Sequence, residues 1–191
     1  MAEQPAEQPP TQPLQRAPTE RRKRALLVCA EDTPQAATAC EWALNNVYQE
    51  GDVVHLTYVV KCLMQPIEVF HGMPGTAYSF SPPGVHREQA LIDDAKKRLE
   101  ERFLPLLQPQ LVPYQLHLYA ERTDATVQRV AEIIQEDIEK TQPALIIMAA
   151  HNKPGTQEGL GSVAEFLSRN CKRPMAIVHP EYAVGTSMEQ L

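Results

Sequence analysis

Short apolar runs alternate with longer amphipathic segments along most of the chain. The short runs are rich in Val, Ile and Leu, which is typical of strands buried in a parallel sheet. The segments between them repeat their apolar residues every three or four positions, the spacing of one helix face. The five predicted strands are Arg24–Ala30, Val53–Val60, Pro113–Ala120, Ala144–Ala150 and Met175–His179.

Amphipathic helices are predicted between these strands. The first begins after Thr33 and Pro34, because threonine suits an N-cap and proline suits the first helical turn. The second runs from His86 to Leu107. The helix after the third strand is expected to be capped by Thr123 or Asp124.

This order of elements predicts an α/β fold. Alternating strands and helices with right-handed crossovers give a doubly wound, flavodoxin-like parallel sheet of five strands. The strand Pro113–Ala120 alternates apolar and polar residues, which favours a sheet edge and makes His117 a surface histidine. The charged residues from Asp93 to Glu101 are interpreted as a solvated helix face.

The chain divides into three parts. Residues 1–23 form a Pro- and Gln-rich tail that we expect to be disordered, residues 24–180 form the domain, and residues 181–191 form a second tail. The basic run Arg21–Arg24 is interpreted as a solvated edge, with a nuclear-import or phosphate-contacting patch as the alternative. Residues 61–85 are a long loop insertion, with a lid or a partner-binding flap as the alternative.

Composition narrows the classes of partner. A formal net charge of −6 argues against a nucleic-acid partner, and no apolar run reaches the roughly 20 residues that span a membrane. The four cysteines show neither zinc-site nor dithiol spacing, and Cys29 and Cys40 lie in apolar segments where we expect them to be buried. We therefore expect the protein in the reducing cytoplasm, with the nucleus as the alternative.

One stretch has the layout of an anion site. The buried strand Ala144–Ala150 is followed by a glycine-bearing loop and then by Ser162, which is expected to cap the next helix. Backbone N–H groups at such a helix start bind phosphate groups.

This stretch resembles the universal stress proteins, small α/β proteins of which many bind ATP. Gly161, Ser162 and Val163 match the end of their phosphate-loop signature, and Ser168–Pro174 matches its closing part. Ala149 and Asn152 stand where the two early glycines of the signature belong, and the loop is one residue shorter.

The first helix carries a second match to the same family. Glu41–Leu44 has the family's Glu-Trp-Ala-Leu sequence. Ahead of it, Glu31 and Thr33 take the places of an aspartate and a serine, in a region that lies against the adenosine part of ATP in nucleotide-binding members.

The resemblance implies a fold, a ligand and an assembly. The fold is an adenine nucleotide alpha hydrolase-like sheet with strand order 3-2-1-4-5. The ligand is ATP or AMP, with Mg²⁺ if ATP, bound in a stress-response module. The assembly is a homodimer formed through the last strand, by Met175, Ala176, Ile177 and Val178. The residues implied to contact the nucleotide are Ala30, Glu31, Thr33, Val59, Met148, Ala149, His151, Asn152, Lys153, Gly161, Ser162 and Val163.

Two alternatives remain open. The sequence holds no recognisable nucleophile, metal or Walker motif, so we expect a binding protein, or at most a slow ATPase. The changes at Ala149 and Asn152 leave a non-nucleotide-binding, dimeric interaction protein of the same fold as the second interpretation.

Overall fold

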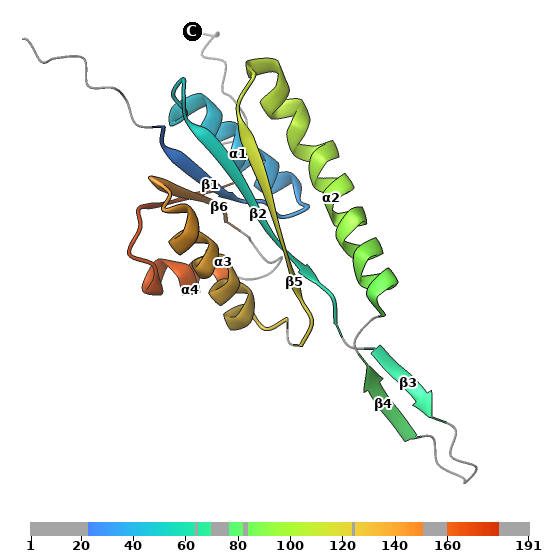
Figure 1. The fold of residues 1–191 in the computed structure, drawn as a ribbon. Coiled ribbons are helices and arrows are strands. Elements are labelled where there is room, and N and C mark those ends of the chain that lie inside the picture. The colour runs from blue at the N-terminus through green and yellow to red at the C-terminus, as the bar shows by residue number, and fades with distance from the viewer. Residues whose placement is uncertain are drawn as a thin grey trace, which may run out of the picture.

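A computed structural model describes residues 23–63, 65–69, 77–81, 84–123, 125–150 and 160–179. Within this part of the chain, five strands form one parallel sheet in the order β5-β2-β1-β6-β7 (Figure 1). Numbered along this sheet alone, the order is 3-2-1-4-5, which confirms the expected topology. The strands are β1 Ala25–Cys29, β2 Val53–Lys61, β5 Tyr114–Glu121, β6 Leu145–Ala149 and β7 Met175–Val178.

Helices cover both faces of this sheet (Figure 1). Side chains of α1 and α2 pack on the face that carries Leu26 and Val28, whereas those of α3 and α4 pack on the face that carries Leu27 and Cys29. Successive residues of a strand point to opposite faces, so β1 serves both cores. The helices are α1 Pro34–Asn46, α2 Val85–Leu107, α3 Val127–Thr141 and α4 Ser162–Asn170, with a 3₁₀ helix η1 at Gln108–Gln110.

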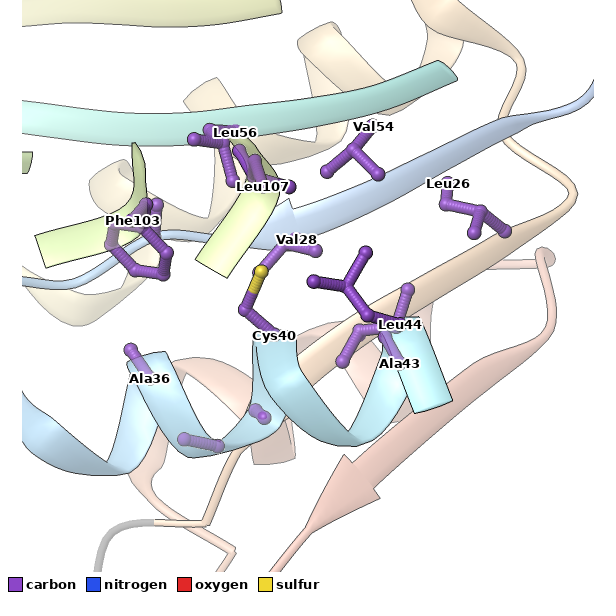
Figure 2. Close-up of a cluster of buried hydrophobic side chains, with 14 of the residues drawn as sticks. Leu26, Val28, Ala36, Cys40, Ala43, Leu44, Val54, Leu56, Phe103 and Leu107 are labelled. Carbon is purple, nitrogen blue, oxygen red and sulfur yellow. The ribbon is translucent and has the colours of Figure 1, made fainter. Parts of the chain in front are cut away.

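The larger core lies between the sheet and the first two helices. Figure 2 shows Val28 of β1 facing Cys40 and Leu44 of α1. Phe103 and Leu107 close the cluster from α2 and are fully buried. Cys29 and Cys40 are buried as expected, and all four cysteines are free thiols.

Helix starts differ in how they are capped. The Thr33 hydroxyl accepts a hydrogen bond from Ala36 N at 3.2 Å, which confirms it as the cap of α1. For α3 the predicted caps are wrong: Thr126 caps it, the Thr123 hydroxyl donates to Glu121 instead, and Asp124 lies outside the described residues.

The fourth helix also departs from the expected cap. Its N-cap is Gly161, and Ser162 is the first helical residue with an exposed side chain. Gly161 has φ 83°, a conformation that glycine adopts without the Cβ strain other residues meet. The backbone conformation at this turn, rather than a side-chain hydroxyl, therefore sets where α4 begins.

The interpretation of residues 61–85 as a loop is wrong in part. Strands β3 Gln65–Val69 and β4 Ala77–Ser81 pair there in antiparallel register as a separate two-stranded sheet. Figure 1 shows this hairpin beyond the carboxyl end of β2, outside the main sheet. Prolines and glycines interrupt the segment and obscured two short runs of strand-forming residues.

The basic run before β1 is also more structured than expected at its last residue. Arg24 donates from Nε to Asp52 Oδ1 at 3.0 Å and from Nη2 to Asp52 Oδ2 at 2.6 Å. Burial alone would raise the pKa of the Asp52 carboxyl, but hydrogen bonds from Arg24 and from the Gln49 backbone outweigh it and lower the pKa. Arg24 thus fixes the start of β1 to the turn that precedes β2.

Candidate functional site

The carboxyl ends of β1 and β6 are the natural place for a ligand. These strands are neighbours, but β1 continues into α1 on one face of the sheet and β6 leads to α4 on the other. Connections that leave in opposite directions open a binding crevice at this point in doubly wound sheets. The predicted nucleotide residues fall on these segments, except for Val59 on β2.

The turn after β1 is held tightly by backbone hydrogen bonds. Ala30 N donates to Thr57 O at 2.8 Å, and Thr33 N donates to Glu31 O at 2.8 Å. Ala30 is fully buried, whereas Glu31 and Thr33 are half-buried. Because the Thr33 hydroxyl oxygen caps α1, its contribution to a ligand is limited to its proton and its remaining lone pair.

Four of the predicted contact residues have buried side chains. Val59 and Met148 belong to the core under α3 and α4, and Ala30 and Ala149 to the core under α1 and α2. Any contact they make with a ligand is therefore made through backbone groups. The Ala149 methyl group belongs to the core under α1 and α2.

The start of α4 presents backbone donors. No side chain among the described residues caps this helix, and Ser162 is exposed while Val163 packs against the core. The first N–H groups of a helix have no intrahelical acceptor, and the helix dipole adds positive potential there. His151, Asn152 and Lys153, which belong to the preceding loop, lie outside the described residues.

Two arginines beside the β1 turn were missed by the sequence interpretation. Arg98 Nε lies 3.1 Å from Asp32 Oδ2, and Arg102 Nε lies 2.9 Å from Asp32 Oδ1. Arg98 also pairs with Asp94 one helical turn away. Arg98 is exposed, as the interpretation of residues 93–101 as a solvated face predicts, but its pairing with Asp32 was not foreseen. The signal in the sequence was the spacing of Arg98 and Arg102, which are four residues apart and therefore lie on the same face of α2.

This arrangement places opposite charges close together at the carboxyl end of β1. Asp32 pairs with both Arg98 and Arg102, and Asp94 pairs with Arg98, so two guanidinium groups meet two carboxylates. All four side chains are partly exposed, so these pairs contribute little to stability.

A second polar cluster lies on the face covered by α3. Asp137, 1% exposed, accepts hydrogen bonds from Thr57 Oγ1 at 2.5 Å, Tyr119 OH at 2.7 Å and His117 Nδ1 at 2.8 Å. Burial alone would raise the pKa of Asp137, but these three hydrogen bonds outweigh it and lower the pKa. The prediction of a surface histidine on an edge strand holds only in part: β5 is an edge strand, but His117 is half-buried because α3 supplies a carboxylate that periodicity alone did not pair with β5.

The predicted dimer strand lies at the other edge of the sheet. One side of β7 pairs with β6, and none of the described residues pairs with the opposite side. Ile146 N donates to Pro174 O and Ala150 N to Val178 O, so the even-numbered residues of β7 face β6. The N–H groups of Met175 and Ile177 therefore point toward the outer edge.

Two further observations bound the chemistry. Among the described residues, no three His, Cys, Asp or Glu side chains come together as a metal-ligand group. No described helix combines the length and the apolarity needed to cross a membrane.

A hollow of about 640 Å³ lies at the opposite end of the sheet, between α3 and the α4–β7 turn, away from the predicted nucleotide residues.

Comparison with known proteins agrees with this fold. The family model of the universal stress protein family matches residues 23–179. A universal stress family protein from Burkholderia pseudomallei has 20% identity and a TM-score of 0.53, covering 81% of this chain and 95% of its own. The universal stress protein from Archaeoglobus fulgidus has 13% identity and a TM-score of 0.55, covering 82% and 98%. The comparison with curated proteins gave no match.

Proposed function

Since this chain belongs to the universal stress protein family, we propose that it binds an adenine nucleotide, ATP or AMP, at the carboxyl ends of β1 and β6. The observation that carries this proposal is the start of α4. That helix begins at a glycine with φ 83°, and no described side chain caps it. In this proposal, its first amide groups donate hydrogen bonds to a phosphate.

The surrounding residues have complementary roles in this proposal. Gly161, Ser162 and Val163 donate backbone hydrogen bonds to phosphate, together with Lys153, Asn152 and His151 of the preceding loop. The Glu31 carboxylate lies against the ribose. The backbones of Ala30, Val59, Met148 and Ala149 line the base, since their side chains are buried. Mg²⁺ accompanies ATP in this proposal.

The proposed setting is a cytoplasmic stress-response module that forms a homodimer. Four free thiols, three of them buried, fit a reducing compartment. The outer edge of β7 fits the pairing surface, because unpaired strand edges add further strands readily.

The test is calorimetric titration with ATP and AMP, with and without Mg²⁺. The first variant is Gly161→Arg, which places a side chain in the proposed phosphate path. The second is Ser162→Asp, which sets a carboxylate at the exposed first position of α4. A negative charge suits a helix start but repels phosphate, so this variant keeps its fold while nucleotide affinity falls at least about tenfold.

Gly84→Arg is the matched control, because Gly84 is exposed and has open space around it. It should bind nucleotide like the wild type. If the folded Ser162→Asp variant retains full affinity, or if wild-type protein gives no heat at millimolar nucleotide, the proposed site is wrong. A dimeric interaction protein that binds no nucleotide is then the remaining function, and the outer edge of β7 is the observation that favours it.

A further inference from the structure

Two histidine rings face each other on the side of the sheet covered by α3. His55 lies on β2 and His117 on β5, with ring centroids 5.0 Å apart and ring planes at 82°. The nearest ring atoms are His55 Nδ1 and His117 Nε2, at 3.2 Å. Both residues lie in the first half of their strands, so the pair is remote from the strand ends that form the proposed nucleotide site.

Asp137 fixes which nitrogen of His117 is available. The Asp137 carboxylate lies 2.8 Å and 3.1 Å from His117 Nδ1 through its two oxygens, and an ionised carboxylate accepts hydrogen bonds only. Nδ1 therefore carries the proton, and neutral His117 presents a lone pair at Nε2 toward His55.

A third donor atom lies beside the pair. The side-chain oxygen of Gln115 is 3.5 Å from His117 Nε2, and Gln115 is the register partner of His55 across the two strands. Residues 55, 115 and 117 thus converge on one surface of the sheet. Gln115 is exposed, so this point is open to water and to ions.

This geometry matches part of a metal site. Two nitrogens that each lie about 2.0–2.1 Å from a tetrahedral Zn²⁺ ion are roughly 3.3 Å apart. A ligating histidine commonly donates its other ring N–H to a carboxylate, which sets its tautomer and orientation. His117 already has that partner in Asp137, itself held by Thr57 and Tyr119.

We infer that His55 Nδ1 and His117 Nε2 bind a late first-row divalent cation such as Zn²⁺, with the Gln115 oxygen and water completing the coordination. Asp137 is a positioning residue. With two histidines and, among the described residues, no group of three His, Cys, Asp or Glu side chains placed to ligate one ion, the site is weaker than a structural zinc site and exchanges its ion with solvent. Imidazole ligands select Zn²⁺, Cu²⁺ and Ni²⁺ over Mg²⁺.

Calorimetric titration of untagged, chelator-treated protein with Zn²⁺ tests the site, with Mg²⁺ as the comparison ion. Wild-type protein should bind one Zn²⁺ equivalent that is lost in both His55→Gln and His117→Gln. His86→Gln removes an exposed histidine of α2 and should keep that equivalent. Asp137→Asn should weaken Zn²⁺ binding by roughly 10–100-fold, as expected for a group behind a ligand.

Nitrogen NMR of ¹⁵N-histidine-labelled wild-type protein needs no variant. Saturating Zn²⁺ should shift one Nδ1 resonance and one Nε2 resonance from different rings. The proposal is wrong if folded His55→Gln protein binds Zn²⁺ as the wild type does, or if Zn²⁺ moves no such pair of resonances. Either result would leave a histidine pair joined only by a hydrogen bond.

Discussion

Asp137 is a carboxylate in the interior between α3 and the strands β2 and β5. Three donors from three different residues satisfy it, so its charge is stabilised without an arginine or lysine. Asp52 is also buried but relies on Arg24 and on the Gln49 backbone. The effects of replacing Asp137 and of replacing Asp52 can therefore be predicted separately.

Replacing Asp137 with asparagine should destabilise the fold by about 1–3 kcal/mol, because its amide nitrogen faces side chains that were donors. Urea unfolding monitored by circular dichroism measures this. Asp93→Asn on the exposed face of α2 is the control and should change the free energy of unfolding by less than about 0.5 kcal/mol. Equal effects of the two substitutions would contradict the assigned role of Asp137.

Asp52 should contribute to the acid sensitivity of the protein. Its pKa in the folded state lies below the unfolded value of about 3.9, since the hydrogen bonds from Arg24 and Gln49 outweigh burial. Its stabilising effect is therefore complete above about pH 4 and is lost as pH falls through the folded-state pKa. Unfolding free energies measured across this range should fall less steeply with acid in Asp52→Asn than in the wild type. Parallel curves would exclude Asp52 as a cause.

At the scale of elements, the helices differ in how their N-termini are capped. The starts of α1 and α3 are capped by threonine side chains, whereas α2 and α4 begin at glycines with no side-chain cap among the described residues. A capped start stabilises the fold, and an uncapped start can serve a ligand. Thr33 combines a capping role and a proposed ligand role, because its hydroxyl caps α1 and it is one of the predicted nucleotide-contact residues.

Thr33→Ala should cost about 0.5–2 kcal/mol of stability, the usual cost of losing such a cap. Thr33→Ser keeps an oxygen at the same position and should recover most of that loss. Thermal unfolding of the three proteins measures the cap, and nucleotide titration of the same samples measures the ligand role. A Thr33→Ala protein that melts like the wild type would show that the cap contributes nothing.

Strands and helices were predictable where one periodicity dominates. Leu26, Leu27 and Val28 are buried on both faces, and that continuous apolar run identified β1. The β3–β4 hairpin was missed because prolines and glycines are interspersed among its strand-forming residues. The partners of Asp137, and the pairing of Arg98 with Asp32, were missed for a different reason. They lie 18 to 80 positions apart for Asp137 and 66 positions apart for Arg98, and no local pattern encodes such partners.

At the scale of the whole molecule, the sheet ends in two outer strands, β5 and β7, and none of the described residues pairs with the outer side of either. His117 and Tyr119 of β5 are tied by side-chain hydrogen bonds to Asp137 of α3, and the N–H groups of Met175 and Ile177 on β7 point outward. Pairing of two copies through β7 gives a closed two-fold assembly, which ends growth at a dimer. The homodimer that we propose forms through the outer edge of β7.

Ile177→Pro should convert a β7-mediated dimer into a monomer. Its N–H points away from β6, so proline removes an outward donor and leaves the β6–β7 hydrogen bonds in place. Light scattering measures the molar mass, and circular dichroism confirms the fold of the variant. A folded Ile177→Pro dimer would place the interface elsewhere.

The central position of β1 has a consequence for synthesis on the ribosome. Leu26 and its neighbours in β1 obtain their second flanking strand only when Leu145 and β6 are made, about 120 residues later. At about 5–20 residues per second, translation of that interval takes roughly 6–24 s. During this time the most apolar strand of the nascent chain has one edge and much of one face exposed, which makes it a binding site for chaperones before the domain is complete.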